Sequence, residues 1–308
     1  DRTIQSPLSV GLFAGKWCSY AATPDLPHDQ REEDGGALVF TSHELKAQTE
    51  LLGAPEVELL LEADVAVAMV ALRLSDVAPD DKATRVTYGL LNLTHRDSRE
   101  HPEPLEPGHP YRIKVRLNDI GHAFPAGHRI RLSISTSYWP LAWPPPTPVR
   151  LTIHTGDSRL SLPVRLASPH SDRVICFAEP EGASPTRIRQ LTEPHHNWRV
   201  IRDLATDVST LEVINDNGTV YLEEIDLEMQ RKTLEWYRYR GDDFNSVEGE
   251  TLWERGFRRG DWRVRSLTRT RLTSTPDTFV IHAELDAYES DRRVFAENKD
   301  VEIDRDLV

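Results

Sequence analysis

The chain has 308 residues and a formal net charge of −13; 38% of the residues are hydrophobic and 28% are charged, as in a water-soluble globular protein with one large or two modest cores. The acidic balance, 50 acidic against 37 basic residues, argues against nucleic acid or an anionic membrane as partner. The longest apolar run, Val65–Leu72, is too short for a membrane span of about 20 residues, and two cysteines, Cys18 and Cys176, are too few for a disulfide scaffold or a thiolate metal site.

The first 165 residues carry the alternating pattern of half-buried strands. In Tyr111–Leu117 every second residue is apolar and the residues between them are charged, which is the period of a strand with one buried face. The pattern recurs at Arg129–Ile134. Further strands are expected at 37–41, 47–52, 56–63, 66–77, 84–94, 149–155 and 159–165. About nine or ten short strands without a helix between them predict an all-β antiparallel sandwich.

The alternation lapses from Ser168 to Pro194, where prolines accumulate, as is typical of a connector or a long surface excursion. We therefore expect three parts. These are a β-sandwich with an N-terminal extension at 1–167, a proline-rich connector at 168–194 and a second antiparallel β region at 195–308.

In the second region, strands are expected at 198–204, 209–215 and 219–228. Asn217 and Gly218 separate the last two and predict a tight hairpin turn. Three long strands at 261–273, 278–289 and 292–303 predict a twisted meander. Helix is expected only as one or two turns around 244–255.

The search for catalytic motifs assigns no residue. The nucleophile elbow G-x-S-x-G of serine hydrolases places a serine between small glycines on a strained turn, but the two glycine pairs with this spacing enclose Phe13 and Arg258. No H-E-x-x-H helix, P-loop or dinucleotide-binding turn occurs either. The sequence therefore predicts neither a catalytic residue nor a cofactor or metal.

Histidines and aspartates in turns are the remaining polar candidates. His122 and His128 flank the turn Phe124–Ala126, where we expect hydrogen-bonded turn histidines and keep a catalytic base as the less common alternative. The adjacent His195 and His196 would point to opposite sides of an extended chain, which makes a poor metal pair. Aspartates at 80, 81, 216, 242 and 243 stand in turns, where aspartate caps backbone amides.

An aromatic, proline-rich segment, Tyr138–Pro146, follows the strand expected at 129–134. Its prolines end the strand and stiffen the loop, so that large rings are held at a low entropy cost. Three interpretations are open for these rings. They could form a lid over the sandwich core, contact another protein or domain, or stack on a sugar.

Four stretches together resemble a known family of domains: Gly53–Val57, Arg73–Asp80, Gly89–Arg96 and Pro125–Ser135. On these motifs, residues from about Leu38 to Pro163 are similar to the C-terminal jelly-roll domain of X-Pro dipeptidyl-peptidases and of the related cocaine-esterase-like and α-amino-acid ester hydrolases. The resemblance implies a jelly-roll, galactose-binding-domain-like β-sandwich. The flanking segments Ser6–Leu8, Pro24–Arg31 and Ile303–Val308 look like a subgroup with an extended C-terminal region.

In that family the catalytic serine, aspartate and histidine belong to an α/β-hydrolase domain that precedes the jelly roll. No position of this chain matches the nucleophile motif, so the resemblance carries over no catalytic residue. It implies a non-catalytic domain that packs on the hydrolase domain and helps to shape the substrate entrance. The residues expected at an interdomain or ligand contact are Tyr138, Trp139, Trp143, His95 and Arg96.

Three functional hypotheses follow. The first is the non-catalytic C-terminal portion of an X-Pro dipeptidyl-peptidase-like or acyl-esterase-like serine hydrolase, with a peptide or ester as ligand; a start at aspartate instead of methionine fits a piece of a longer chain. The alternative is a free-standing carbohydrate- or protein-binding module, in which Trp139 and Trp143 would stack on sugar rings. The third is an enzyme with an unfamiliar site among His95, His122 and His128. We expect a soluble, cytoplasmic protein and leave a homo-oligomer open.

Overall fold

The computed structural model describes residues 1–16, 27–166 and 176–308. Strands dominate these ranges, which confirms the all-β prediction. The chain forms two compact units, the first made of residues 1–171 together with 306–308 and the second of residues 172–305. Among the described residues, no helix is long and apolar enough to cross a membrane.

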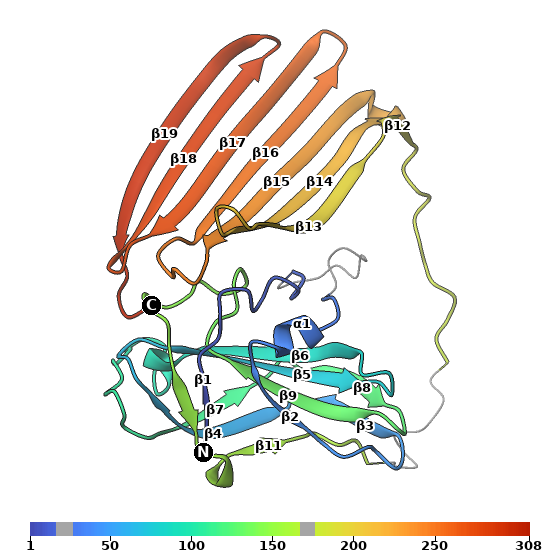
Figure 1. The fold of residues 1–308 in the computed structure, drawn as a ribbon. Coiled ribbons are helices and arrows are strands. Elements are labelled where there is room, and N and C mark those ends of the chain that lie inside the picture. The colour runs from blue at the N-terminus through green and yellow to red at the C-terminus, as the bar shows by residue number, and fades with distance from the viewer. Residues whose placement is uncertain (17–26, 167–175) are drawn as a thin grey trace. The chain divides into compact units, whose positions relative to one another are not determined.

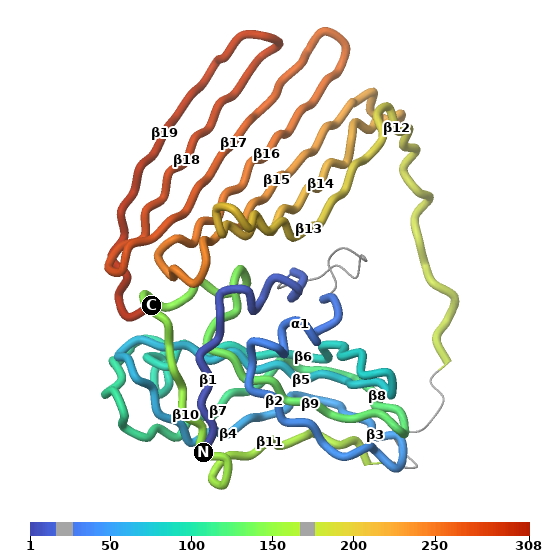
Figure 2. Tube along the Cα trace, in the orientation of Figure 1, coloured from blue at the N-terminus to red at the C-terminus, as the bar shows by residue number. Residues whose placement is uncertain are grey.

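Two antiparallel sheets face each other in the first unit (Figure 1). The first sheet contains β1 (Arg2–Ile4), β4 (Glu56–Ala63), β7 (Tyr111–Arg116), β10 (Leu151–Ile153) and β11 (Arg159–Ser161). β4 pairs with β7 along one edge and with β10 and then β11 along the other, while β1 lies beside β10 (Figure 2). The second sheet has the order β2 (Leu38–Thr41), β9 (Arg129–Ser135), β5 (Met69–Val77) and β6 (Ala83–Asn92).

The remaining elements of this unit are short. β3 (Thr49–Gly53) and β8 (Ile120–Phe124) form a two-stranded sheet. The helical turns of the described chain are α1 (Arg31–Asp34), η2 (Leu93–His95), η3 (Thr155–Asp157) and, in the second unit, η4 (Glu223–Ile225). The jelly-roll strand order implied by the resemblance stays a prediction.

The core of the first unit lies between the two sheets because their strands alternate as the sequence predicts. Along β4 every second residue is buried, including Leu59 and Leu61. Opposite them lie Leu72 and Leu74 of β5, both fully buried. Burying one such side chain contributes about 1.5–3 kcal/mol, so this shared cluster holds the two sheets together.

β5 differs from the other strands because all nine of its residues are buried. The face that includes Leu72 meets the sandwich core, and the opposite face, with Ala71 and Arg73, is covered by residues 10–14, α1 and the segment after β9. A strand covered on both faces has an almost continuous apolar run. In β5 this run is Met69–Leu72, and Arg73 interrupts it. The N-terminal segment is therefore an integral third layer of this unit.

The second unit is one large antiparallel sheet, with the order β12-β14-β15-β16-β17-β18-β19 and β13 also paired to β14 (Figure 1). The bounds are β12 (Ile188–Thr192), β13 (His195–Asp203), β14 (Val208–Leu222), β15 (Leu227–Arg240), β16 (Glu248–Arg259), β17 (Trp262–Ser274), β18 (Thr278–Glu289) and β19 (Arg292–Asp304). The last three strands confirm the predicted meander.

The strand register gives this sheet two unlike faces. One face carries more apolar cross-strand neighbours than the other, for example Leu211 opposite Tyr237 and Phe257 opposite Val264. The other face is richer in charged residues; there Glu250 lies opposite Arg271 of β17 on one side and Trp236 of β15 on the other. The sheet is thus amphipathic across its strands.

Two predictions for the second region are wrong. The turns of helix expected around 244–255 are replaced by β16, because pairing with two neighbouring strands outweighs the local helix preference of its Glu, Leu and Arg residues. Asn217 and Gly218 form a bulge inside β14 instead of a hairpin turn, at the point where the partner of β14 changes from β13 to β12. The connector at 168–194 stays a prediction; β12 lies within these bounds, and residues 168–175 lie outside the described residues.

Candidate functional site

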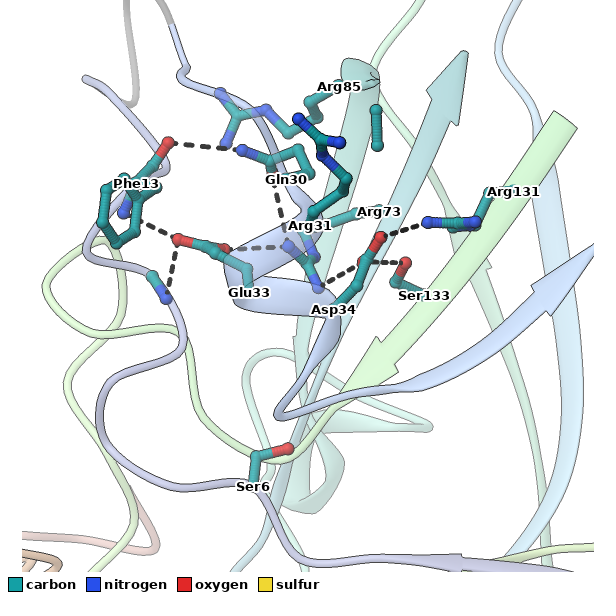
Figure 3. Close-up of polar contacts among 12 residues, drawn as sticks. Ser6, Phe13, Gln30, Arg31, Glu33, Asp34, Arg73, Arg85, Arg131 and Ser133 are labelled. Carbon is teal, nitrogen blue, oxygen red and sulfur yellow. Dashed lines mark hydrogen bonds and ion pairs between the residues drawn. The ribbon is translucent and has the colours of Figure 1, made fainter. Parts of the chain in front are cut away.

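A buried ionic group lies between α1 and the outer face of β5 (Figure 3). Arg73 and Glu33 are only 0% and 1% exposed. The Nη1 atom of Arg73 donates to Glu33 Oε2 at 2.9 Å and to Gln30 Oε1 at 3.0 Å. We define the α1 cluster as Gln30, Glu33, Asp34, Arg73, Arg131 and Ser133.

Glu33 ties the N-terminal segment to this cluster. Its Oε1 atom accepts the backbone N–H groups of Gly11 and Phe13 at 3.0 and 2.7 Å. Burial raises the pKa of Glu33, and Arg73 together with the two N–H donors opposes that shift. Because a buried charge needs paired and hydrogen-bonded surroundings, these contacts explain why a carboxylate is tolerated here.

Asp34 completes the cluster on the side of β9. Its Oδ1 atom accepts from Arg73 at 3.2 Å and from the Ser133 hydroxyl at 2.7 Å, and its Oδ2 atom accepts from Arg131 at 2.9 Å. Both oxygens are thus occupied within the unit. The carboxylates of the α1 cluster are already hydrogen-bonded to donors of the same chain. The cluster therefore has a structural role, which is to hold α1 on the sheet.

The aromatic segment predicted as a contact lies on the same outer face. Tyr138 is fully buried, and its hydroxyl accepts a 2.7 Å hydrogen bond from Arg85. The Arg73 guanidinium lies 5.9 Å from the centre of the Tyr138 ring. Burial raises the pKa of Tyr138 to about 12, against the opposing effect of Arg85. Tyr138 is therefore part of the packing that surrounds the α1 cluster.

The two tryptophans of this segment differ in exposure. Trp139 is 2% exposed, which leaves no open ring face for sugar stacking. Trp143 is half-buried and meets Trp139 edge to face, with ring centres 5.0 Å apart. The contact predicted for the segment stays a prediction, and of its three rings Trp143 is the one with exposed surface to offer.

His95 is the last residue of η2, the helical turn that follows β6, and Arg96 comes directly after it. Arg96 donates to the carbonyl of Glu103 at 2.8 Å and stacks over Tyr111, 4.4 Å from the ring centre. It therefore fastens the loop after η2 to β7. His95 is half-buried. Their predicted role at a contact also stays a prediction.

His122 and His128 converge on one carboxylate, Asp76 of β5. His122 Nε2 lies 3.0 Å from Asp76 Oδ2, and His128 Nδ1 lies 2.7 Å from Oδ1. Asp76 is 8% exposed. The geometry agrees with the expected hydrogen-bonded turn histidines. His95 is not a partner in these contacts. Across the described ranges, no group of three or more His, Cys, Asp or Glu side chains could hold a metal ion.

The other polar candidates have contacts of their own. His195 and His196 are exposed neighbours in β13, and their backbone positions lie opposite Asp216 and Asn215 of β14. Asp216 accepts the Gly218 N–H at 2.9 Å. Asp80, Asp81 and Asp243 also contact nearby chain, through the N–H of Lys82, the Arg129 side chain and the N–H of Asn245.

Sequence reasoning missed the α1 cluster. Two signals could have found it: Arg73 interrupts the apolar run of β5, and adjacent acidic residues stand at 32–34. An arginine in a strand buried on both faces requires a carboxylate partner. Without the fold, however, the separation of 39–40 residues between Arg73 and its partners hides the pair.

Comparison with known proteins identifies the first unit. A family model described as the X-Pro dipeptidyl-peptidase C-terminal non-catalytic domain matches residues 1–201. The chain belongs to this family. The region that matches the family model extends through the first unit and ends within β13.

Curated relatives of this family member include cocaine esterase of Rhodococcus sp. (strain MB1 Bresler), 25% identical over 37% of this chain and 20% of the relative. A putative Xaa-Pro dipeptidyl-peptidase of Bacillus cereus is 24% identical over 53% of this chain and 28% of the relative. Among solved structures, an α-amino acid ester hydrolase is 23% identical with a TM-score of 0.48, over 53% of this chain and 32% of that one. The chain thus spans about a fifth to a third of the proteins it matches.

Proposed function

We propose that this chain is the non-catalytic C-terminal portion of an X-Pro dipeptidyl-peptidase-like or acyl-esterase-like serine hydrolase. In this role it packs on an α/β-hydrolase domain and shapes the entrance to the active site. The observation that carries the proposal is the family match over residues 1–201. The names of the relatives, a cocaine esterase and a dipeptidyl-peptidase, support hydrolysis of an ester or of an X-Pro peptide by the longer protein.

The packing of the aromatic segment supports a role for Trp143 in that contact. Tyr138 and Trp139 are buried and anchor the segment to the first unit. Trp143 keeps part of its ring exposed and rests on Trp139. A half-exposed ring on a fixed support loses little entropy when it meets a partner surface, and tryptophan is a frequent anchor of interfaces.

Two measurements test the proposal. The purified chain should not turn over p-nitrophenyl esters or X-Pro-p-nitroanilides above a mock preparation, and turnover that a serine-directed inhibitor blocks would overturn it. The coding region upstream should encode a G-x-S-x-G motif in the same reading frame; a frame that closes without that motif would also overturn it.

A variant of the longer protein tests the role of Trp143. Truncation of an interface aromatic costs about 1–2 kcal/mol, so Trp143→Ala should raise KM roughly tenfold with little change in kcat. The matched control is Trp262→Ala, because Trp262 is 49% exposed and belongs to the second unit. Equal KM values for the two variants would remove Trp143 from the proposed entrance.

A further inference from the structure

An apolar cleft of about 360 Å³ opens between the two sheets of the first unit. Phe40, Ile130 and Leu132 line it from β2 and β9, and Leu59, Ile153 and Leu160 line it from β4, β10 and β11. All six of these lining residues have large hydrophobic side chains. Close-packed protein interiors contain few voids larger than a water molecule, so this cleft departs from the rest of the sandwich core.

The strand pairing explains why the cleft is open. β10 pairs with residues 61–63 of β4 and β11 pairs with residues 56–58, so the two middle residues of β4 lie between these partners. The chain leaves the sheet between β10 and β11 as η3. The opposing edge strand β2 has only four residues, and its Phe40 is 37% exposed. Short edges on both sheets therefore leave the core accessible from this side.

A polar pocket of about 520 Å³ adjoins the cleft and shares Ser158 and Arg159 with it. Arg112 and Glu58 also line this pocket. Arg159 Nε lies 3.4 Å from Glu58 Oε2, and the Arg159 side chain is 68% exposed. Arg112 donates to the Asp157 carbonyl at 3.0 Å. Since a guanidinium carries five N–H donors, both arginines can engage a further acceptor.

We propose that the cleft binds a medium-chain monocarboxylate, with the hydrocarbon chain between the sheets and the carboxylate at Arg112 and Arg159. Apolar cavities of about 150 Å³ bind benzene, and this cleft is more than twice that volume. At about 30 Å³ for a water-sized group, it holds about a dozen non-hydrogen atoms, the size of decanoate. Arginine is the side chain best suited to a carboxylate because its N–H groups match both oxygens.

This site is separate from the proposed entrance contact. The ligand has about a dozen non-hydrogen atoms, and its carboxylate competes with Glu58 for Arg159. We therefore expect a dissociation constant on the order of 10–100 μM. The site needs no catalytic domain, so the chain as it stands should bind the ligand whether or not the proposed function holds.

Calorimetric titration of the full chain with decanoate, decanol and butyrate tests the proposal. Decanoate should bind, decanol should bind at least tenfold more weakly for want of the carboxylate, and butyrate should not bind measurably. Absence of decanoate binding at 1 mM, on the order of ten times the weakest expected dissociation constant, would overturn the proposal. Equal affinity for decanol would overturn the assignment of the carboxylate to the arginines.

Variants locate the site. Leu160→Trp should fill the cleft and abolish binding, and the Arg112→Ala/Arg159→Ala pair should weaken binding about tenfold or more. Arg116→Ala is the matched control, because Arg116 is an exposed arginine of β7 that pairs with Asp119 outside the lining of both pockets. Unchanged binding by a folded Leu160→Trp chain would overturn the proposal.

Methyl NMR covers the case in which the filled variant does not fold. Decanoate should shift the methyl signals of Ile130 and Ile153, which line the cleft. Ile281 is the internal reference, since it lies on the apolar face of the second unit's sheet. Shifts confined to Ile281 would place the ligand on that face and overturn the cleft assignment.

Discussion

Replacement of Arg73 by methionine tests whether the α1 cluster holds the third layer of the first unit. Methionine keeps much of the apolar stem and removes the guanidinium. Glu33 and Asp34 then lose a donor at 2.9 and 3.2 Å, in a place where Glu33 is 1% exposed. The substitution therefore leaves carboxylates with an uncompensated charge and little water to solvate them.

Removal of one partner from a buried ion pair destabilises a protein by about 3–5 kcal/mol. That is a large share of a domain stability of about 5–15 kcal/mol. With a urea m-value of about 2 kcal/mol/M, the midpoint of unfolding should fall by roughly 1.5–2.5 M. Hydrogen exchange of the full chain at increasing urea, read by mass spectrometry on peptides from β5, reports this unit separately from the second one.

Arg116→Met is the control, because the Arg116–Asp119 pair has side chains 64% and 66% exposed and such pairs contribute about 0–1 kcal/mol. In the Arg73→Met/Glu33→Gln double variant, the loss should be smaller than the sum of the single losses, since the charge left unpaired is removed too. The reasoning fails if Arg73→Met lowers the midpoint no further than Arg116→Met does.

Three further predictions concern packing, backbone and pH. Trp139→Ala should lower stability by about 3–5 kcal/mol, measured by urea unfolding, whereas Trp143→Ala should cost less because its ring is only half-buried. Gly218→Ala should cost more than about 1 kcal/mol, since a Cβ would collide with the backbone oxygen of Thr192, and Gly260→Ala, with a similar φ but open space, should cost less by thermal melting. Burial raises the pKa of Glu250, but hydrogen bonds and charge from its two arginine partners outweigh this and lower that pKa overall. Ionised Glu250 therefore stabilises the fold above the ordinary glutamate pKa, and this stabilisation is lost as pH falls through the pKa of the folded state. In Glu250→Gln the free energy of unfolding should fall less steeply with decreasing pH. Acid unfolding curves identical to those of the unchanged chain would contradict the assignment.

Period-two alternation predicted many strands of both units. It placed β4 at its observed bounds and the last three strands within one residue, because one face of each strand is more apolar than the other. β1 and β8 were missed: they have only three and five residues, and β8 includes Gly121 and His122 among its apolar residues. Short strands are held by their pairing partners, which local sequence does not identify.

Local turn chemistry misled the prediction at Asn217 and Gly218. Gly218 does adopt a positive φ of 65°, as the turn signal requires. The strand nevertheless continues, because β12 and β13 both pair with β14 and meet at this point. The residue type predicted the backbone conformation correctly, whereas the tertiary pairing decided whether the chain reversed.

The candidate site was the least accessible to sequence reasoning because it depends on contacts between distant segments. Tyr138 and Trp143 share one loop signal, yet one is buried against Arg85 and the other is half-exposed. The alternation of β4 predicted the apolar lining of the cleft, but the gap itself arises from how β10 and β11 divide the edge of β4.

The same chemistry, arginine paired with carboxylate, serves different ends in the two units. Arg73 is fully buried and fixes a third layer over a sandwich that already has a core. In the second unit Glu250 accepts from Arg238 at 2.8 Å and from Arg269 at 2.7 Å, joining three neighbouring strands on the charged face of a sheet. Cross-strand pairs stabilise a sheet locally, and here they connect strands side by side. The buried pair thus specifies which segments pack together, while the charged-face pairs reinforce the order of strands in the sheet.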